Sequence, residues 1–167
     1  MSYKNKTYIA FDGDNDMKYY RMMTAWASNQ YIDFDFYNAH ELNCSHDWAR
    51  TESIKRQLHE RLENSKLFIL LIGTSTKRLT RFVKYEVETA MRMNLPIICV
   101  NLNGNREIDN FSPDWFGDYP RIYVPFKERI IKYAMDNWPN SYNFSNGSGS
   151  YCYKDSVYSS LGINRWE

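Results

Sequence analysis

Glu86 is the residue whose position in this sequence most clearly points to chemistry. It lies in RFVKYEVETAM, residues 81–91, where apolar and polar residues recur with the spacing of an amphipathic α-helix. At about 100° per residue, Glu86 falls inside the apolar arc of that helix, whereas Glu88 falls on the polar side. A carboxylate in that place is either a functional group that points inward to a ligand, or a residue at the rim of the apolar face that pairs with a nearby Lys or Arg.

A second set of carboxylates, Asp12, Asp14 and Asp16, follows the first apolar segment and is spaced like the start of a calcium-binding loop. Such a loop needs glycine at its sixth position and a bidentate acid at its twelfth, and this chain has Met17 and Met23 there. We therefore interpret the segment as a solvated turn and predict no metal site.

The segments that must position these carboxylates alternate between strand and helix patterns. Predicted strands cover residues 6–11, 33–38, 67–73, 96–102 and 121–124, and predicted helices cover residues 17–27, 51–65, 81–91 and 125–138. The alternation predicts an α/β fold with a doubly wound, five-stranded parallel sheet in the flavodoxin-like order 2-1-3-4-5. Residues 1–138 should form this domain. Residues 139–167 read as a linker-like C-terminal tail, docked or disordered, that adds little to the core.

In such a sheet, ligands bind at the carboxyl ends of the strands, near the switch point between strands one and three. Those ends supply residues 11–14, 38–40, 73–76 and 103–104. The helix that carries Glu86 starts at the same edge, so its carboxylate is expected just below the pocket.

Two other chemistries that this topology supports do not match the strand ends. A phospho-receiver domain would need an aspartate at the end of the third strand, where this chain has Gly73, Thr74 and Ser75. A flavodoxin-type phosphate loop would need a Ser/Thr/Gly-rich turn after the first strand. The turn there is acidic and would repel a phosphate.

Composition narrows the class of protein further. The 167 residues have a net charge of +1 without a basic run, which gives no reason to expect nucleic acid as a partner. The longest apolar run is too short to span a bilayer and no apolar signal region is present, so we expect a cytoplasmic protein with no membrane contact. Cys44, Cys99 and Cys152 are far apart, which disfavours a disulfide framework or a zinc site.

With these residues in place, the chain resembles a TIR domain, and more narrowly the ThsB-type TIR-like proteins of bacterial Thoeris antiphage systems. The resemblance covers residues 7–138. YIAF followed by an acidic turn resembles the first strand of the family, and RLENSKLFILLIG resembles its helix and third strand. FVKYE, ending at Glu86, resembles the W-C-x-x-E helix start. Phe82 replaces the usual tryptophan, Val83 the cysteine, and Ala10 the serine of the first strand.

The resemblance implies an enzyme that cleaves the bond between nicotinamide and ribose in NAD, with NAD as substrate and no separate cofactor. Glu86 would be the catalytic carboxylate, stabilising an oxocarbenium-like ribose as in glycoside hydrolysis. Candidate substrate contacts are Phe11, which would stack on a ring, and the polar residues Asp12, Asn38, Ser75 and Thr76.

The implied product is a cyclic or conjugated ADP-ribose signal that activates a separate NAD-depleting effector. Further partners expected from the resemblance are a second copy of the chain and a phage-derived trigger. The aromatic loop 103–119 supplies apolar surface suited to self-association. Two other functions stay open: a non-catalytic TIR-like interaction module, and a flavodoxin-like nucleotide binder without turnover.

Overall fold

The computed structural model describes residues 6–29, 36–38, 51–141 and 149–165. The strands are β1 (Thr7–Ala10), β2 (Phe36–Asn38), β3 (Leu67–Ile72), β4 (Ile97–Asn101), β5 (Arg121–Pro125) and β6 (Ser150–Cys152). The helices are α1 (Met17–Ser28), α2 (Thr51–Glu63), α3 (Val83–Arg92), α4 (Glu128–Ser141) and α5 (Asp155–Ser160), with a short 3-10 helix, η3 (Thr76–Arg78).

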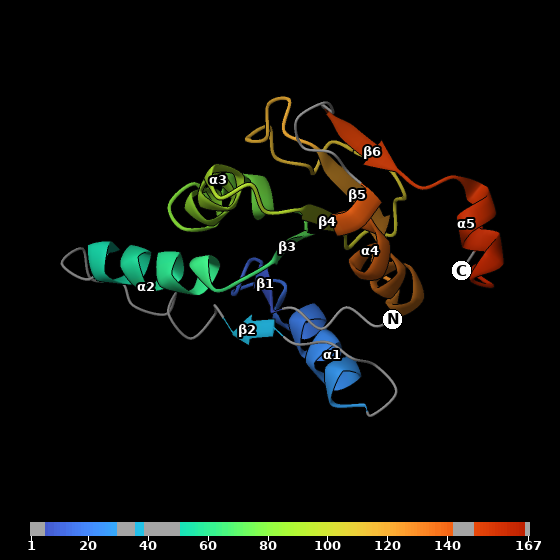
Figure 1. Cartoon of the computed structure of the whole chain (residues 1–167), viewed down its shortest axis with the longest axis horizontal. Coiled ribbons are helices and arrows are strands. Elements are labelled where there is room, and N and C mark those ends of the chain that lie inside the picture. The colour runs from blue at the N-terminus through green and yellow to red at the C-terminus, as the bar shows by residue number, and fades with distance from the viewer. Residues whose placement is uncertain (1–5, 30–35, 39–50, 142–148, 166–167) are drawn as a thin grey trace.

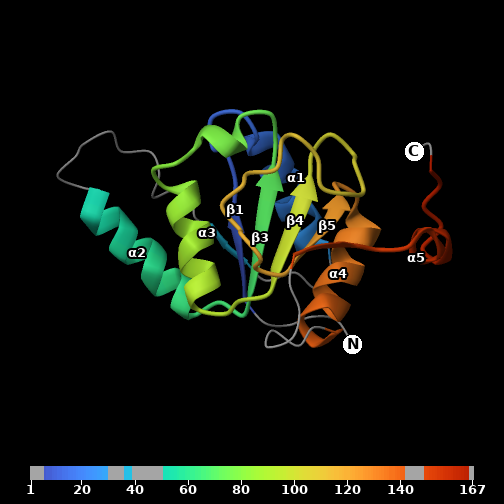
Figure 2. The same ribbon diagram turned by 90° about the horizontal axis from the view of Figure 1, so that it is seen from above.

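The described strands form one sheet in the order β2-β1-β3-β4-β5-β6, and every neighbouring pair is parallel. The first five strands follow the expected order 2-1-3-4-5, so the α/β, flavodoxin-like fold is confirmed. Helices α2 and α3 cover one face of the sheet, and α1 and α4 cover the other (Figure 1). The turned view shows β3 and β4 pointing toward the edge where η3 and the start of α3 lie (Figure 2).

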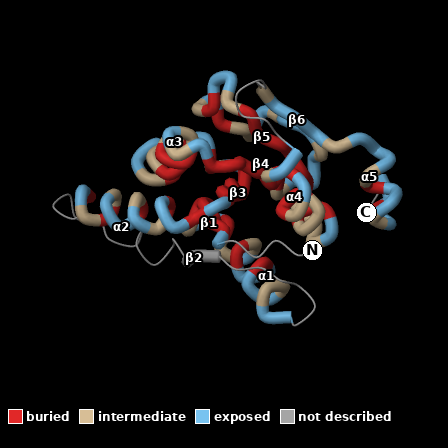
Figure 3. The backbone as a smooth tube through the Cα atoms, viewed as in Figure 1, coloured by how far each residue is buried: buried red, intermediate tan, exposed pale blue. Residues whose placement is uncertain are grey.

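Strand β3 shows why a continuous apolar run forms the centre of this sheet. All of its residues are buried (Figure 3), because helices cover both faces and successive side chains point to opposite sides. Ile69 and Leu71 enter the core shared with α1 and α4. Phe68 and Leu70 enter the core shared with α2 and α3. Each side of the sheet therefore has its own core, and the position of a functional side chain can be given by the core that it enters.

The aromatic loop 103–119 packs onto the core on the α2/α3 side. Phe116 is 3% exposed, and Phe111, Trp115 and Tyr119 pack against the same cluster. The Tyr119 hydroxyl donates a hydrogen bond to the carbonyl of Leu95, at 2.6 Å. Much of the aromatic surface of the loop is therefore packed inside the molecule and does not support self-association. Self-association remains a prediction.

The described C-terminal residues, 149–165, are docked, which was one of the two alternatives left open by the sequence. Strand β6 extends the sheet beyond β5, with Tyr151 opposite Ile122. Tyr158 of α5 is fully buried and Ile163 nearly so, and both belong to the core on the α1/α4 side. The expectation that this segment adds little to the core was wrong, because two large side chains anchor it without any apolar periodicity.

Arg106 fastens α5 to the loop after β4. Its guanidinium is 3.0 Å from the Asp155 carboxylate and lies over the Tyr158 ring, 3.9 Å from the ring centroid. It also donates a hydrogen bond to the carbonyl of Asn164. From α4, Arg129 donates to the carbonyl of Leu161 at 3.0 Å. The segment is thus held at both ends of α5.

Candidate active site

Glu86 lies in the first turn of α3 and faces the sheet. It is 0% exposed, and both carboxylate oxygens are shielded from solvent. On the helix it stands among Val83, Val87 and Ala90, which are buried in the core on the α2/α3 side. The interpretation of Glu86 as a solvated residue at the rim of the apolar face is therefore excluded. Burying a carboxylate so completely is costly, so its retention needs a reason beyond packing.

Tyr8, in the middle of β1, is the residue that the structure brings to Glu86. Its side chain is fully buried on the same side of the sheet. Burial raises the pKa of Tyr8 well above its ordinary value, and the neighbouring Glu86 carboxylate raises it further by charge and hydrogen bonding. The phenol is therefore held protonated, able to donate toward the carboxylate. Nothing in the sequence pattern of β1 distinguishes Tyr8 from a core aromatic.

Two contacts fix the start of α3 against α2. Arg81 donates a hydrogen bond to the hydroxyl of Thr51, the first residue of α2, and its guanidinium lies 4.9 Å from the ring centroid of Phe82. One turn further on, the Tyr85 hydroxyl donates to the carbonyl of Lys55 at 3.4 Å. The turn that carries Glu86 is thus anchored to a neighbouring helix as well as to the sheet.

Two of the predicted substrate contacts, Asp12 and Thr76, make hydrogen bonds within their own turns. Asp12 Oδ1 accepts hydrogen bonds from the backbone N–H groups of Asp14 and Asn15, at 3.0 and 3.3 Å. Thr76 is fully buried, and its hydroxyl accepts a hydrogen bond from the backbone N–H of Gly73 at 2.9 Å. Both side chains shape the loops at the carboxyl edge of the sheet, a role typical of Asp and Thr in turns.

The other predicted contacts lie apart from Glu86 or outside the described side chains. Phe11 is buried in the opposite core, on the α1/α4 side, where it stacks on Tyr20 with ring centroids 4.7 Å apart. Ser75 is partly exposed in the loop just before η3. Asn38 ends β2, and its side chain lies outside the described part of the chain. A role for these residues in substrate binding stays a prediction.

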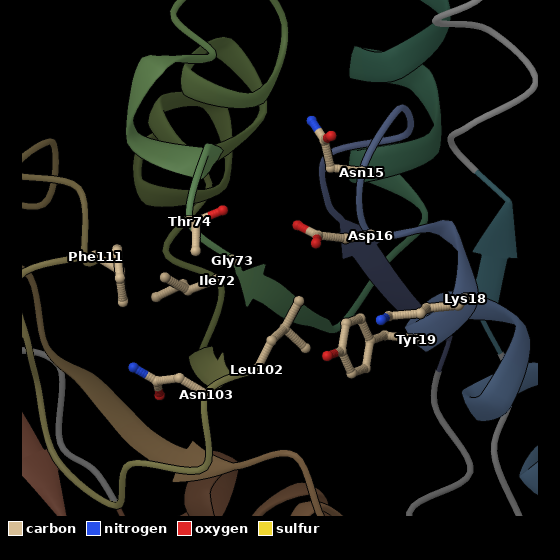
Figure 4. Close-up of a pocket in the computed structure, with 10 residues that line it drawn as sticks. All are labelled: Asn15, Asp16, Lys18, Tyr19, Ile72, Gly73, Thr74, Leu102, Asn103 and Phe111. Atoms are coloured by element: carbon tan, nitrogen blue, oxygen red, sulfur yellow. The ribbon is translucent and has the colours of Figure 1, made fainter.

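A pocket of about 380 Å³ opens at the carboxyl edge, between the start of α1 and the ends of β3 and β4. The sequence placed a ligand at this edge but considered Asp16 only as part of a calcium-like loop. The Asp16 carboxylate points toward Gly73 and Thr74 (Figure 4). Burial, and then the charge of Asp12, raise the pKa of Asp16 to about 6, while Lys18 acts in the opposite direction. Glu86 is not among the residues that line this pocket.

The three acids of the first turn do not converge on a common point. Asp12 faces its own turn, Asp14 is exposed and Asp16 lines the pocket. Within the described ranges, no three His, Cys, Asp or Glu side chains are grouped so that they could hold a metal ion. In the same ranges, no helix has the length and apolar character needed to cross a membrane.

The sequence matches a known protein family whose matched range contains the residues described above. The family described as Thoeris protein ThsB, TIR-like domain, matches residues 8–107, from β1 into the loop after β4. This range contains Tyr8, Asp16, Gly73 and Glu86. No curated protein matches the sequence. Because the family match covers more than half of the chain and the sheet has the expected parallel order, the protein belongs to the ThsB family of TIR-like domains.

Proposed function

We propose that this protein consumes NAD, cleaving the bond between nicotinamide and ribose, and that Glu86 is its catalytic carboxylate. The observation that carries the proposal is a carboxylate buried on the apolar face of α3, in a chain that belongs to the ThsB TIR-like family. A completely buried acid has little value for packing and a high desolvation cost, so a role in chemistry is the simplest reason for it.

To cleave the bond between nicotinamide and ribose, the protein has to supply a correctly placed negative charge and no general acid. When the bond between nicotinamide nitrogen and ribose C1′ breaks, its electron pair leaves with nicotinamide, which is neutral after departure and needs no acid. Positive charge develops on the ribose, as in glycoside hydrolysis. A fixed carboxylate beside the sugar stabilises that charge, more strongly where water is excluded. Tyr8 is a positioning residue in this proposal, since its protonated hydroxyl lies beside the Glu86 carboxylate.

The acceptor at ribose C1′ then decides the product. Water gives ADP-ribose, whereas a ribose or adenine atom of the same molecule gives a cyclic isomer. Following the family, we propose a cyclic or conjugated ADP-ribose signal that reaches a separate NAD-depleting effector. The protein would act in the cytoplasm as an antiphage signalling enzyme with a phage-derived trigger, and a second copy of the chain would take part.

One observation favours a second function. Both Glu86 oxygens are shielded from solvent, so a ribose can reach them only after the surrounding side chains move. A non-catalytic interaction module would keep the carboxylate closed permanently, whereas an enzyme must open it. The catalytic proposal therefore requires two states, with the closed one described here. A nucleotide binder without turnover is the third alternative.

Nucleotide profiling of cells that express the protein, with and without phage challenge, separates these functions. The catalytic proposal expects nicotinamide release and a new ADP-ribose species on challenge, both lost in Glu86→Gln. The matched control is Glu88→Gln, which changes a partly exposed acid of the same helix. If cells that express Glu86→Gln still resist the phage, and their nucleotides do not change on challenge, the result would support the interaction module. Saturable NAD binding without nicotinamide release would support the binder.

A further inference from the structure

Helix α2 is a neighbour of Glu86 that does not belong to the sheet. Leu58 and Leu62 of α2 enter the same core as Val83 and Val87, which lie on either side of Glu86 on α3. Among the described elements, α2 packs mainly against α3, and the turned view shows it along the outer side of that helix (Figure 2). Helix α2 can therefore shift away from α3 without breaking any pairing between strands.

The Tyr8–Glu86 pair lies close to this boundary between α2 and α3. Burial, and then Glu86, raise the pKa of Tyr8, and the charge of Arg61 on α2 acts in the opposite direction. Tyr85, next to Glu86 in the chain, extends its hydroxyl to the carbonyl of Lys55 on α2. On the other side, the pair is backed by β1, which is paired with β2 and β3. Separation of α2 from α3 would therefore open a way to the carboxylate while the sheet stays intact.

The two halves of α2 are held with different strength. In the C-terminal half, Leu58 and Leu62 are fully buried. In the N-terminal half, the buried residues are Thr51 and Ile54. Because apolar stabilisation grows with the area removed from water, two buried leucines hold their half more firmly than one isoleucine holds the other. The N-terminal half, residues 51–55, is consequently the part that separates from α3 at the lower cost.

Polar contacts hold this N-terminal half against the start of α3. The Arg81 guanidinium donates a hydrogen bond to the hydroxyl of Thr51. The Tyr85 hydroxyl donates to the Lys55 carbonyl at 3.4 Å, and the Lys55 ammonium lies 5.1 Å from the centroid of the Tyr85 ring. Water replaces each partner when such a contact opens, so the net strength of each contact is modest. These contacts can be released without unfolding the domain.

We propose that these contacts, Arg81 with Thr51 and Tyr85 with Lys55, form a latch that keeps Glu86 closed to solvent. Release of the latch moves residues 51–55 away from the start of α3 and admits the substrate. The inference rests on the proposed function for its purpose, because NAD cleavage needs an open state, but the opening itself can be measured without catalysis. A trigger would act by binding the open state more tightly than the closed one.

The test measures how fast a water-soluble carbodiimide with glycinamide converts the Glu86 carboxylate to an amide in the full chain. Trypsin cuts after Lys84 and Arg92, so one peptide, residues 85–92, contains both Glu86 and the partly exposed Glu88. Mass spectrometry of this peptide gives the labelling rate of Glu86 relative to that of Glu88. The measurement reports access to the carboxylate and needs no enzymatic activity.

Two variants weaken the latch at separate contacts. Thr51→Val removes the acceptor of the Arg81 hydrogen bond and keeps the shape of the side chain. Labelling of Glu86 should become about tenfold faster, the change in open population expected for the loss of one charge-assisted hydrogen bond. Tyr85→Phe should accelerate labelling less, because the hydrogen bond that it removes is long and uncharged.

Two controls separate release of the latch from general loosening. Thr89→Val removes the same kind of hydrogen bond, donated by Arg92, but within α3 itself, so Glu86 should be labelled at the wild-type rate. Asp16, a buried acid at the start of α1, should be labelled at the same rate in every variant.

The outcomes distinguish the latch from the proposed function. Wild-type labelling of Glu86 in both Thr51→Val and Tyr85→Phe would overturn the latch. A parallel rise at Asp16, or an equal rise in Thr89→Val, would overturn it as well. Faster labelling together with nicotinamide release from NAD in the absence of phage supports the latch and the enzyme. Faster labelling without nicotinamide release supports the latch and counts against NAD cleavage.

Discussion

The hydroxyl of Tyr8, on β1, lies beside the carboxylate of Glu86, on α3, and both side chains are fully closed to solvent. The pair joins the first strand of the sheet to the helix that follows its third strand. Burial and the neighbouring Glu86 raise the pKa of Tyr8, so the phenol stays protonated beside the carboxylate and can orient it. Substitutions at Tyr8 and Glu86 should therefore affect activity and stability differently.

The change Tyr8→Phe should lower product formation while the protein stays folded, because it removes the hydroxyl that lies beside Glu86 and keeps the aromatic packing. The fall should appear in kcat with little change in KM for NAD, a split that a purely structural role would not produce. Unchanged kcat and KM would remove Tyr8 from the positioning role.

The change Glu86→Gln should abolish nicotinamide release and leave thermal stability equal or slightly higher, since it removes a charge from an apolar environment. The opposite result identifies a structural role: if the carboxylate is half of a buried ion pair, breaking the pair costs roughly 3–5 kcal/mol. Thermal denaturation of Glu86→Gln and Glu88→Gln side by side decides between the two. Glu88, partly exposed and 3.9 Å from Lys84, should change neither quantity by much.

The change Gly73→Ala should destabilise the fold, because the added methyl group collides with the Asp16 carboxylate. Overpacking of this kind costs roughly 1–3 kcal/mol. The same substitution in an Asp16→Ala background should cost clearly less, because the colliding atoms are gone. Urea denaturation of the two single variants and the double variant measures the coupling. Additive effects would show that the strain arises elsewhere.

Asp16 should also make stability depend on pH. Its pKa is about 6 in the folded protein against 3.8 ordinarily, so between these values the folded state binds more protons than the unfolded state. The contribution of Asp16 to stability is therefore lost as pH rises from about 4 to about 6, and above that the ionised carboxylate destabilises the fold. A penalty of about 1 kcal/mol corresponds to roughly 2–4 °C in Tm. The difference in Tm between wild type and Asp16→Asn should vary over this range and level off above pH 7.

Tyr158 should carry much of the stability of the docked C-terminal segment. Tyr158→Ala removes a fully buried ring from the core and from beneath the Arg106 guanidinium. Replacing a large buried aromatic by alanine typically costs about 3–5 kcal/mol. Ser159→Ala, at an exposed neighbouring position, should stay within about 0.5 kcal/mol of wild type. A Tyr158→Ala protein as stable as Ser159→Ala would mean that the segment does not contribute to folding.

How far the sequence predicts the structure depends on the kind of signal. The apolar run of β3 and the amphipathic pattern of α3 were sufficient for the parallel sheet and for the inward orientation of Glu86, because periodicity reports which face is buried. Tyr8 gave no signal, since an aromatic in a strand buried on both faces looks the same whether it packs or touches a functional group. Asp16 was recognised only as part of a solvated acidic turn, and its burial was missed because it depends on Gly73, distant in sequence. Tyr158 lies in a six-residue helix, too short to show a period.

The parallel pairing of β6 with β5 means that residues 149–165 are held by contacts as well as by the peptide chain. The pairing, the buried Tyr158 ring and the ties made by Arg106 and Arg129 would all survive a break in the backbone between Ser141 and Gly149. The protein is consequently suited to division into two fragments at this point, with the smaller piece reassociating as the last strand of the sheet. Reassembly of such fragments would then report directly on whether the rest of the sheet has folded.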